Sequence, residues 1–312
     1  MQGAERSSVP VVIATRDRGD AVVGALRSIF ACRPSPSEVW VVDQSRDDRT
    51  ARAVAGLDSN GFRYLRSPTV GQSRAHNIAI AQLDAERVAI TDDDCEVPVD
   101  WLARFDRAFA LDPRIAVIFG NVAAADHDPR EGFVPAYARA TPFLAKGPRD
   151  KWRIDGMGAC MGIRRAVWKD LGGFDEMLGP GARHPAAAEG DFVLRTLQAG
   201  WWVYETPDIE VVHHGFRSTV EARALLAGYA RGTGAMMAKH IRCGSPDTRR
   251  LLARMAWRWI RRRRPEALRL GSDYAGGMRL RNFARGFLSG FRTPLDRERC
   301  LYRDSDTPEE IE

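Results

Sequence analysis

The chain has 312 residues, of which 44% are hydrophobic, and a net charge of +6, which fits one large α/β domain or a domain with an appendage. It contains no run of about 18 apolar residues, so no transmembrane helix is expected, and its N-terminus lacks the apolar core of a signal peptide. The five cysteines are scattered without a Cys-x-x-Cys pair, which argues against a zinc ribbon or a disulfide scaffold and favours a reducing cytoplasm.

Strands alternate with helices over the first hundred residues, and this alternation predicts a mostly parallel sheet. Short apolar runs typical of buried strands are each followed by a segment with apolar residues at helical spacing. The expected strands cover residues 9–14, 39–42, 62–65 and 88–90, and helices begin near residues 22 and 71.

Polar side chains follow three of these strands directly, namely Thr15, Asp43 and Asp92. Ligands of open α/β sheets bind outside the carboxyl ends of the strands, so we expect the three side chains on one edge of the sheet. Each of them alone could equally be a turn former or a helix cap.

The strand over residues 88–90 leads into three consecutive carboxylates, Asp92, Asp93 and Asp94. Adjacent carboxylates repel one another, and a divalent cation would relieve that repulsion. Hard oxygen ligands suit Mg²⁺ or Mn²⁺. Because side chains two apart on a strand share a face, Asp92 and Asp94 can point at one ligand while Asp93 points away. The competing interpretation is a solvated acidic turn.

The common phosphate-binding motifs are missing. The chain has no G-x-x-x-x-G-K-[ST] sequence, which argues against a P-loop NTPase, and Gly156-Met157-Gly158 does not continue into a dinucleotide fingerprint. If phosphate binds to this chain, the metal must therefore neutralise it.

Residues 99–171 are expected to form a helix with Asp100 as its N-cap, a strand over 115–119 and a short helix over 165–171 that stops at Gly172-Gly173. The intervening residues 124–155 are interpreted as loops that border the site. Residues 156–163 are small and apolar, as suits a backbone that packs close to a ligand.

Glu189 and Asp191 open a further helix, where acidic residues could act chemically or merely complement the helix dipole. Asp191 and Arg195 stand at i,i+4 and could pair. Short strands over 202–204 and 209–212 lead to His213, which could be a third metal ligand or a solvated surface histidine.

Residues 249–264 hold eight arginines and no acidic residue, so the basicity of the chain belongs to this segment. Arg250, Arg254, Arg258 and Arg261 lie opposite an apolar face of Leu251, Leu252, Met255, Trp259 and Ile260 in a basic amphipathic helix. Such a helix could lie on an anionic membrane surface, pack on the domain with its arginines exposed, or bind nucleic acid. The acidic tail, residues 304–312, is expected to be disordered.

With these stretches placed, the chain resembles the family 2 glycosyltransferases with the GT-A fold from about Val9 to about Phe216. The matching stretches are residues 11–18, 41–45, 71–77, 91–94, 171–175 and 189–191, together with Val212-His213. The resemblance implies an α/β, Rossmann-like, mostly parallel sheet flanked by helices over residues 1–217. Residues 218–303 would be a helical extension and 304–312 the tail.

The resemblance also implies roles for individual residues. Asp43 would read the nucleotide base, Thr15 and Arg18 would line that pocket, and Arg74 would lie near the diphosphate or ribose. In the D-x-D motif, Asp92 and Asp93 would face the nucleotide, whereas Asp94, with His213, would hold Mg²⁺ or Mn²⁺. The catalytic base would be Glu189 or Asp191, because the chain has glutamate where the family usually has aspartate. The acceptor side would include Gly158, Ala159 and Cys160.

A single carboxylate base suits one displacement with inversion, whereas a glycosidase needs two flanking carboxylates. The resemblance implies a nucleotide-sugar donor, with a UDP-sugar first and dTDP or GDP open, and a glycan or lipid-linked acceptor. The scattered cysteines favour a cytoplasmic enzyme, and the arginine run, which lies beyond the resembling stretch, suggests peripheral contact with the inner face of the cell membrane. No nucleic-acid partner is expected. The alternatives are a sugar-nucleotide pyrophosphorylase, whose glycine-rich N-terminal loop is absent, and a non-enzymatic binding protein that uses the arginine run.

Overall fold

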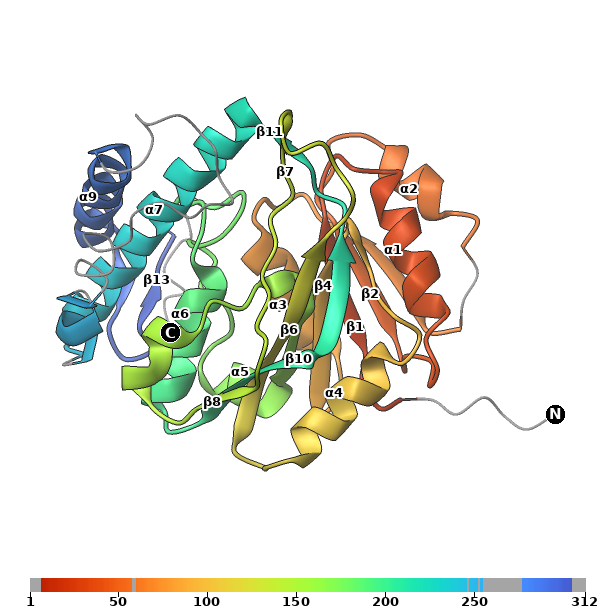
Figure 1. The fold of residues 1–312 in the computed structure, drawn as a ribbon, viewed down its shortest axis with the longest axis horizontal. Helices are drawn as coiled ribbons and strands as arrows, with labels where there is room; N and C mark the ends of the chain where they lie inside the picture. The colour runs from red at the N-terminus through yellow and green to blue at the C-terminus, as the bar shows by residue number, and fades with distance from the viewer. Residues whose placement is uncertain (1–6, 58–59, 246, 252, 255–276, 305–312) are drawn as a thin grey trace, which may run out of the picture.

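The computed structural model describes residues 7–57, 60–245, 247–251, 253–254 and 277–304. A nine-stranded sheet forms its centre (Figure 1), in the order β3-β2-β1-β4-β9-β6-β10-β5 with β8 beside β10. Its strands are β1 (Val11–Thr15), β2 (Val39–Asp43), β3 (Phe62–Arg66), β4 (Arg87–Asp92), β5 (Cys95–Glu96), β6 (Ile115–Ala124), β8 (Phe143–Ala145), β9 (Met161–Arg164) and β10 (Trp202–His213).

The first half of the sheet is parallel, as the strand–helix alternation predicts. β1 pairs in parallel with both β2 and β4, and β2 pairs in parallel with β3. β9 is antiparallel to its neighbours β4 and β6 and joins this half to the parallel pair β6–β10. The carboxyl ends of β1, β2 and β4 therefore form one continuous edge.

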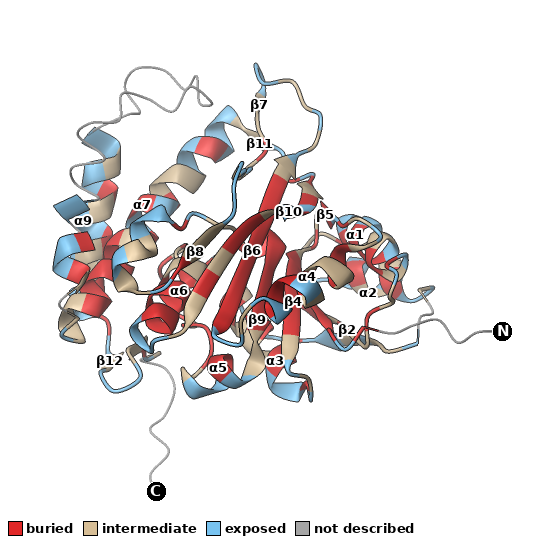
Figure 2. Cartoon of the chain, turned by 60° about the horizontal axis from the view of Figure 1, so that its bottom comes forward, coloured by how far each residue is buried: buried red, intermediate tan, exposed pale blue. Residues whose placement is uncertain are grey.

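Helices cover both faces of the sheet, whose central strands are buried (Figure 2). Alternate residues of β1 divide between two apolar clusters: Val11 and Ile13 pack with α1 and α4, and Val12 packs with α3, α5 and α6. This division follows from the period of two along a strand. The helices are α1 (Ala21–Phe30), α2 (Arg49–Val54), α3 (Gln72–Gln82), α4 (Trp101–Ala110), α5 (Arg165–Asp170) and α6 (Ala188–Gln198).

The C-terminal third packs against α6 as a third layer. α7 (Thr219–Arg242) and α9 (Gly277–Arg292) lie side by side at one flank of the molecule (Figure 1), and the hairpin of β12 (Leu295–Asp296) and β13 (Leu301–Tyr302) completes the layer. The two helices approach closely at Gly286, where an added Cβ would lie 1.9 Å from the carbonyl oxygen of Arg231. Only glycine leaves room for that contact.

The cysteines of this region differ from what the sequence predicted, and the expected domain boundary lies within a paired strand. The structure joins Cys243 and Cys300 in a disulfide across 57 residues, so the scattered cysteines do not argue against a disulfide. The expected domain boundary after residue 217 falls inside β11 (Arg217–Ser218), which pairs with β7 (Gly132–Phe133). We propose that residues 218–303 are an extension packed on the first domain and not a separate unit.

Three local expectations also differ from the structure. Residues 124–155 contain β7, β8 and the 3₁₀ helix η1 (Pro148–Arg153), so they are not loops throughout. Asp100 stands at the N-cap of α4, but its side chain pairs with Arg104 at 2.8 Å instead of capping the helix. The two short strands expected over 202–204 and 209–212 are one strand, β10, with a register shift between Glu205 and Glu210.

Only the start of the arginine run lies within the described residues. There, residues 247–251 and 253–254 are helical, Leu251 is buried, and Arg250 and Arg254 are exposed. These residues agree with the start of the expected two-faced helix. Leu252, Arg258, Arg261 and the expected apolar residues from Met255 onward lie outside the described residues, as do 305–312. Among the helices that the structure describes, none is long and apolar enough to cross a membrane.

Candidate active site

The predicted edge is confirmed for the three side chains that follow strands. In the sheet register, Thr15 lies opposite Asp43 and Ala14 lies opposite Asp92. Backbone pairing therefore brings residues 77 positions apart in the chain onto one edge, at the carboxyl ends of β1, β2 and β4.

The acidic triplet is held by three side chains from elsewhere in the chain, Thr15, Arg18 and His213. Asp93 accepts a hydrogen bond of 2.6 Å from Thr15 Oγ1 and one of 3.1 Å from Arg18, whose guanidinium also pairs with Asp94. Asp94 Oδ1 lies 3.1 Å from His213 Nε2. β4 ends at Asp92 and a tight turn carries Asp93 and Asp94, so the turn, rather than strand alternation, directs Asp92 and Asp94 to one place.

The triplet carries strong mutual repulsion. Burial, followed by the charge of Asp94, raises the pKa of Asp92 to about 7, and burial also raises the pKa of Asp93 against the opposing charge of Arg18. Burial disfavours the Asp94 carboxylate as well, but the hydrogen bond from His213 and the charge of Arg18 outweigh it and hold its pKa at about 2. A divalent cation would stabilise all three carboxylates in their ionised form.

Asp92, Asp94, Cys95 and His213 could hold such a cation, because one ligand atom from each lies within 4.8 Å of all the others. The His213 Nδ1 lies 2.8 Å from the carbonyl oxygen of Pro135. A carbonyl can only accept, so Nδ1 carries a proton and Nε2 is the atom that faces the carboxylates. Burial raises the pKa of the Cys95 thiol far above its usual range, which leaves two carboxylates and an imidazole as a ligand set that fits Mg²⁺ or Mn²⁺.

Asp43 is fully buried at the end of β2. Its two carboxylate oxygens accept hydrogen bonds of 2.8 Å from the Ser45 amide and 2.6 Å from the Tyr64 hydroxyl. A carboxylate has about four acceptor positions, so Asp43 keeps acceptor capacity, but a nucleotide base can reach it only if the side chains that cover it move aside. Tyr64 comes from β3 and was not among the predicted site residues.

Arg74 has different surroundings from those that the resemblance implies. Its guanidinium lies 2.7 Å from Glu176 and 3.2 Å from Asp304, so a role at the diphosphate requires these partners to be exchanged. The residue of α3 that reaches the acidic triplet is Gln72, whose side-chain amide donates to Asp92 at 2.8 Å.

Glu189 opens α6 and lies beside Gly158. A Cβ added at Gly158 would lie 2.6 Å from Glu189 Oε1. Burial raises the pKa of Glu189, while backbone amides of Glu189 and Gly158 and the charge of Lys151 act against that shift. The charge of Glu189 in turn contributes to the raised pKa of Asp92, so the carboxylate and the candidate cation site share one electrostatic environment.

Replacing Gly158 by alanine should displace the Glu189 carboxylate and reduce turnover by at least about tenfold, because misplacement of a reacting group by about 1 Å can cost a factor of about 10². Gly147→Ala is the matched control, since a Cβ there meets nothing within 4 Å. Initial rates at saturating substrates measure the effect. Equal rates for the two variants would show that the contact at Gly158 does not position Glu189.

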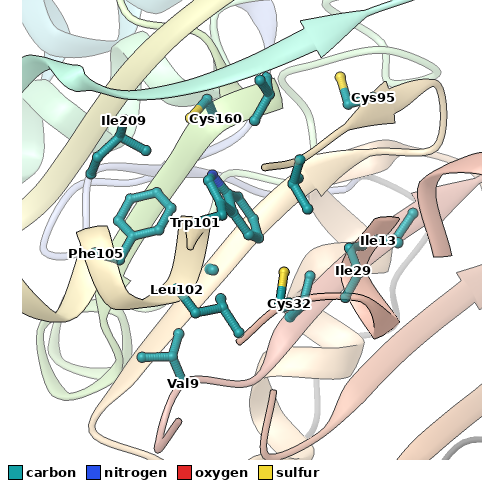
Figure 3. Packing of buried hydrophobic residues seen from close by; sticks show 14 of the residues in the cluster. Val9, Ile13, Ile29, Cys32, Cys95, Trp101, Leu102, Phe105, Cys160 and Ile209 are labelled. Carbon is teal, nitrogen blue, oxygen red and sulfur yellow. The ribbon is translucent and has the colours of Figure 1, made fainter. Parts of the chain in front are cut away.

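The other two predicted acceptor-side residues face the interior. Ala159 is buried and accepts a hydrogen bond of 2.8 Å from Thr91. Cys160 lies in the apolar cluster with Trp101 and Ile209 (Figure 3), where it has no exposed surface. Of the three, Gly158 is the one that reaches a candidate catalytic side chain.

Asp191 lies in a buried ionic network between α6 and α7. Its Oδ2 accepts from Arg195 at 2.9 Å, as the i,i+4 spacing predicted, and its Oδ1 lies 2.7 Å from Lys239 Nζ and 2.9 Å from His240 Nε2. Lys239 also pairs with Asp175 at 2.5 Å. Asp191 and Lys239 have no exposed surface, so this geometry favours Glu189 over Asp191 as the group that meets a substrate.

Replacing Lys239 by methionine should destabilise the fold by about 3–5 kcal/mol, because the buried carboxylate of Asp175 loses the cation it pairs with and Asp191 keeps only Arg195 as a cationic partner. Chemical denaturation measures the loss, and Lys169→Met, on the exposed side of α5, is the matched control. If the two variants were equally stable, the network would contribute nothing to holding α6 on α7.

Comparison with known proteins identifies the family. The sequence profile of glycosyl transferase family 2 matches residues 11–172, about half of the chain. The chain belongs to this family. As a family 2 glycosyltransferase it is an enzyme, and neither the pyrophosphorylase nor the non-enzymatic binding protein is favoured.

Among curated proteins, the glycosyltransferase is similar to the N-acetylglucosaminyl-diphospho-decaprenol L-rhamnosyltransferase of two Mycobacterium tuberculosis strains. In each, the identity is 27% over 255 residues, which cover 68% of this chain and 77% of the relative.

Two solved structures confirm the expected GT-A fold. The Pyrobaculum calidifontis mannosyltransferase PcManGT, in complex with GDP-Man and Mn²⁺, superposes with a TM-score of 0.58 at 19% identity and covers 91% of this chain and 87% of its own. S. aureus TarS 1–349 gives a TM-score of 0.53 at 15% identity, over 75% of this chain and 65% of its own.

The glycosyltransferase has a third side chain at this site, besides Gln72 and Tyr64, that sequence patterns did not predict. Tyr229 of α7 is 41% exposed, and desolvation followed by the charges of Glu189 and Asp92 raises the pKa of its hydroxyl to about 12. Its distance along the chain explains why it was missed, since α7 lies beyond the stretch that resembles the family. Its hydroxyl is a candidate donor to an acceptor sugar.

Proposed function

We propose that this glycosyltransferase moves a sugar from a nucleoside-diphosphate sugar, a UDP-sugar first among them, to a hydroxyl group of a lipid-linked saccharide, with inversion at the anomeric carbon. The observation that carries the proposal is the placement of the Glu189 carboxylate against Gly158, where its charge acts on Asp92 of the cluster of Asp92, Asp94 and His213. A lipid-linked acceptor is supported by the name of the mycobacterial relative.

In this proposal, the Glu189 carboxylate takes the proton of the acceptor hydroxyl as that oxygen attacks the anomeric carbon. A carbon–oxygen bond forms to the acceptor while the bond from the anomeric carbon to the diphosphate oxygen breaks on the opposite side. The raised pKa of Glu189 makes it a stronger base than an exposed glutamate. One base and one displacement give inversion.

Asp92, Asp94 and His213 are the residues that would hold Mg²⁺ or Mn²⁺, which supplies Lewis-acid stabilisation of the leaving diphosphate when bound. Asp43, Thr15 and Arg18 would orient the nucleoside at the adjacent strand ends. Asp93 holds Thr15 and Arg18 in place through its hydrogen bonds to both, so we assign it a positioning role there.

A panel of UDP-, dTDP- and GDP-sugars, each with Mn²⁺, Mg²⁺ or EDTA, tests this function by thermal shift and by release of the nucleoside diphosphate. We expect the sugars of one nucleotide to raise the melting temperature of the protein when Mn²⁺ or Mg²⁺ is present, and to have no such effect in EDTA. Stabilisation that is equal in EDTA would contradict the metal-assisted part, and the absence of any effect from the whole panel would contradict the donor class.

A further inference from the structure

A cavity of about 240 Å³ lies between η1 and the start of the arginine run, in a part of the chain that the proposed catalytic residues do not use. Arg149 and Trp152 line it from η1, and Asp247, Arg250 and Arg254 line it from the facing helical segment. We call these five residues the arginine pocket. No catalytic or nucleotide role described above involves any of them.

The arginine pocket has excess positive charge. Its one carboxylate, Asp247, lies 3.8 Å from Arg149 Nε and 3.8 Å from Arg250, beyond hydrogen-bonding distance. Among the described residues that line the pocket, three guanidinium groups thus face one carboxylate, which leaves an excess of two positive charges. The Arg149 and Arg250 side chains are 72% and 66% exposed, so each can leave its long contact with Asp247 and turn its planar donors toward an entering phosphate.

An aromatic ring forms the remaining wall. The guanidinium of Arg254 lies 5.5 Å from the centre of the Trp152 ring, close enough for a cation–π contact that helps to hold it in place. Trp152 is 39% exposed and buried Leu251 also lines the cavity. The pocket therefore combines anion-binding groups with apolar surface, as a phosphate carried on a lipid requires.

The position of η1 relates the pocket to the candidate base. In a 3₁₀ helix, residues three apart share a face, so Arg149 and Trp152 point together into the pocket. Lys151 lies on a different face, where its charge acts on Glu189 and its Nζ would lie 4.0 Å from a Cβ at Gly190. The pocket and the Glu189 carboxylate thus flank the same short helix.

We propose that the arginine pocket binds the diphosphate of a lipid-linked acceptor whose sugar hydroxyl reaches Glu189, an inference that rests on the proposed function. A diphosphate esterified at both ends carries two negative charges, which match the excess of two positive charges in the pocket. The cavity is smaller than the about 300 Å³ at the lower limit of sites for drug-sized ligands. It therefore accommodates the head group and leaves the lipid chain outside.

Farnesyl diphosphate, a short soluble analogue that is esterified at one end only and so carries further negative charge, tests the pocket by titration calorimetry without any donor present. Arg250→Ala should weaken its binding by at least about tenfold, the effect of losing one charge-assisted hydrogen bond. Arg249→Ala is the matched control, because it removes the same charge from the neighbouring exposed position outside the pocket, and it should change affinity by less than about twofold.

Four results would overturn the pocket assignment. The parent protein could fail to bind farnesyl diphosphate, or bind farnesol as tightly, or lose affinity equally in both variants, as expected if only surface charge acts. Finally, both variants could float with phosphatidylglycerol vesicles equally less than the parent while they bind farnesyl diphosphate as the parent does. That result would assign the arginines to a membrane surface. The affinity for UDP in the presence of Mn²⁺, measured in parallel, should be the same in the parent and both variants. If the parent did not bind UDP, the proposed function would be contradicted and not the pocket assignment.

Discussion

Glu189→Gln should slow sugar transfer by at least about a hundredfold while binding of donor and metal stays at the level of the parent enzyme. A general base typically contributes about 10² to 10⁴ to the rate, and it acts on the acceptor's proton rather than on the donor. Glutamine keeps the shape that fits beside Gly158, so the substitution removes the basic oxygen without opening a gap. Rates at saturating donor and acceptor separate lost chemistry from weakened binding.

Glu210→Gln is the control for this variant, because it removes one glutamate charge from an exposed position of β10 and should leave the rate unchanged. Asp191→Asn is a poor control, since it disturbs the buried contacts with Arg195 and Lys239. If Glu189→Gln retained parental turnover, the base would be another group and the proposed mechanism would be wrong.

The pH dependence of kcat provides a second signature of Glu189. Burial raises its pKa above the ordinary value for glutamate, and only the ionised form accepts a proton. The rate should therefore fall as pH drops through this raised pKa, and the acid limb should lie at a higher pH than an exposed glutamate would give. In Glu189→Gln that limb should disappear, and any limb that remains would belong to the acidic triplet.

Sequence patterns predicted the residues at the carboxyl-end edge of the sheet, because each of those positions depends only on a short stretch of neighbouring residues. Each strand is a short apolar run that ends in a polar residue, and parallel pairing then aligns the ends of neighbouring strands. Thr15, Asp43 and Asp92 came together for this reason. The same reasoning assigned Asp92 and Asp94 to one ligand, although a tight turn after β4 and not strand alternation produces that arrangement.

Contacts between distant segments could not be predicted in this way. The sequence placed Asp191 in the first turn of a helix as a candidate base, but in the structure Lys239 and His240 of α7 contact its carboxylate. Arg74 pairs with Asp304, 230 residues later, and Cys243 with Cys300. Neither hydrophobic periodicity nor a short motif predicts such pairs, because they form only when the C-terminal layer packs on the rest of the structure.

Asp94→Asn should weaken Mn²⁺-dependent UDP binding by at least about a hundredfold, toward the affinity measured in EDTA. Loss of a group that only supports a metal ligand typically costs about 10- to 100-fold in metal affinity, so loss of a direct carboxylate ligand should cost at least the upper end of that range. Asparagine keeps an oxygen that can accept from His213 and Arg18, so the fold and the neighbouring Asp93 contacts should persist and the melting temperature should change little.

The control for Asp94→Asn is Glu96→Gln, a substitution two residues later on β5. Glu96 is exposed and lies 3.5 Å from His214, so its loss removes the same charge near the site without touching the candidate ligand cluster. Calorimetric titration of UDP with Mn²⁺ and with EDTA should therefore separate the two variants by about two orders of magnitude. If Asp94→Asn bound UDP as the parent does, with Mn²⁺ still required, the cation would depend on Asp92 and His213 without Asp94. If neither variant nor the parent required Mn²⁺, Arg18 would be the better candidate for neutralising the diphosphate, since its guanidinium already lies against Asp93 and Asp94.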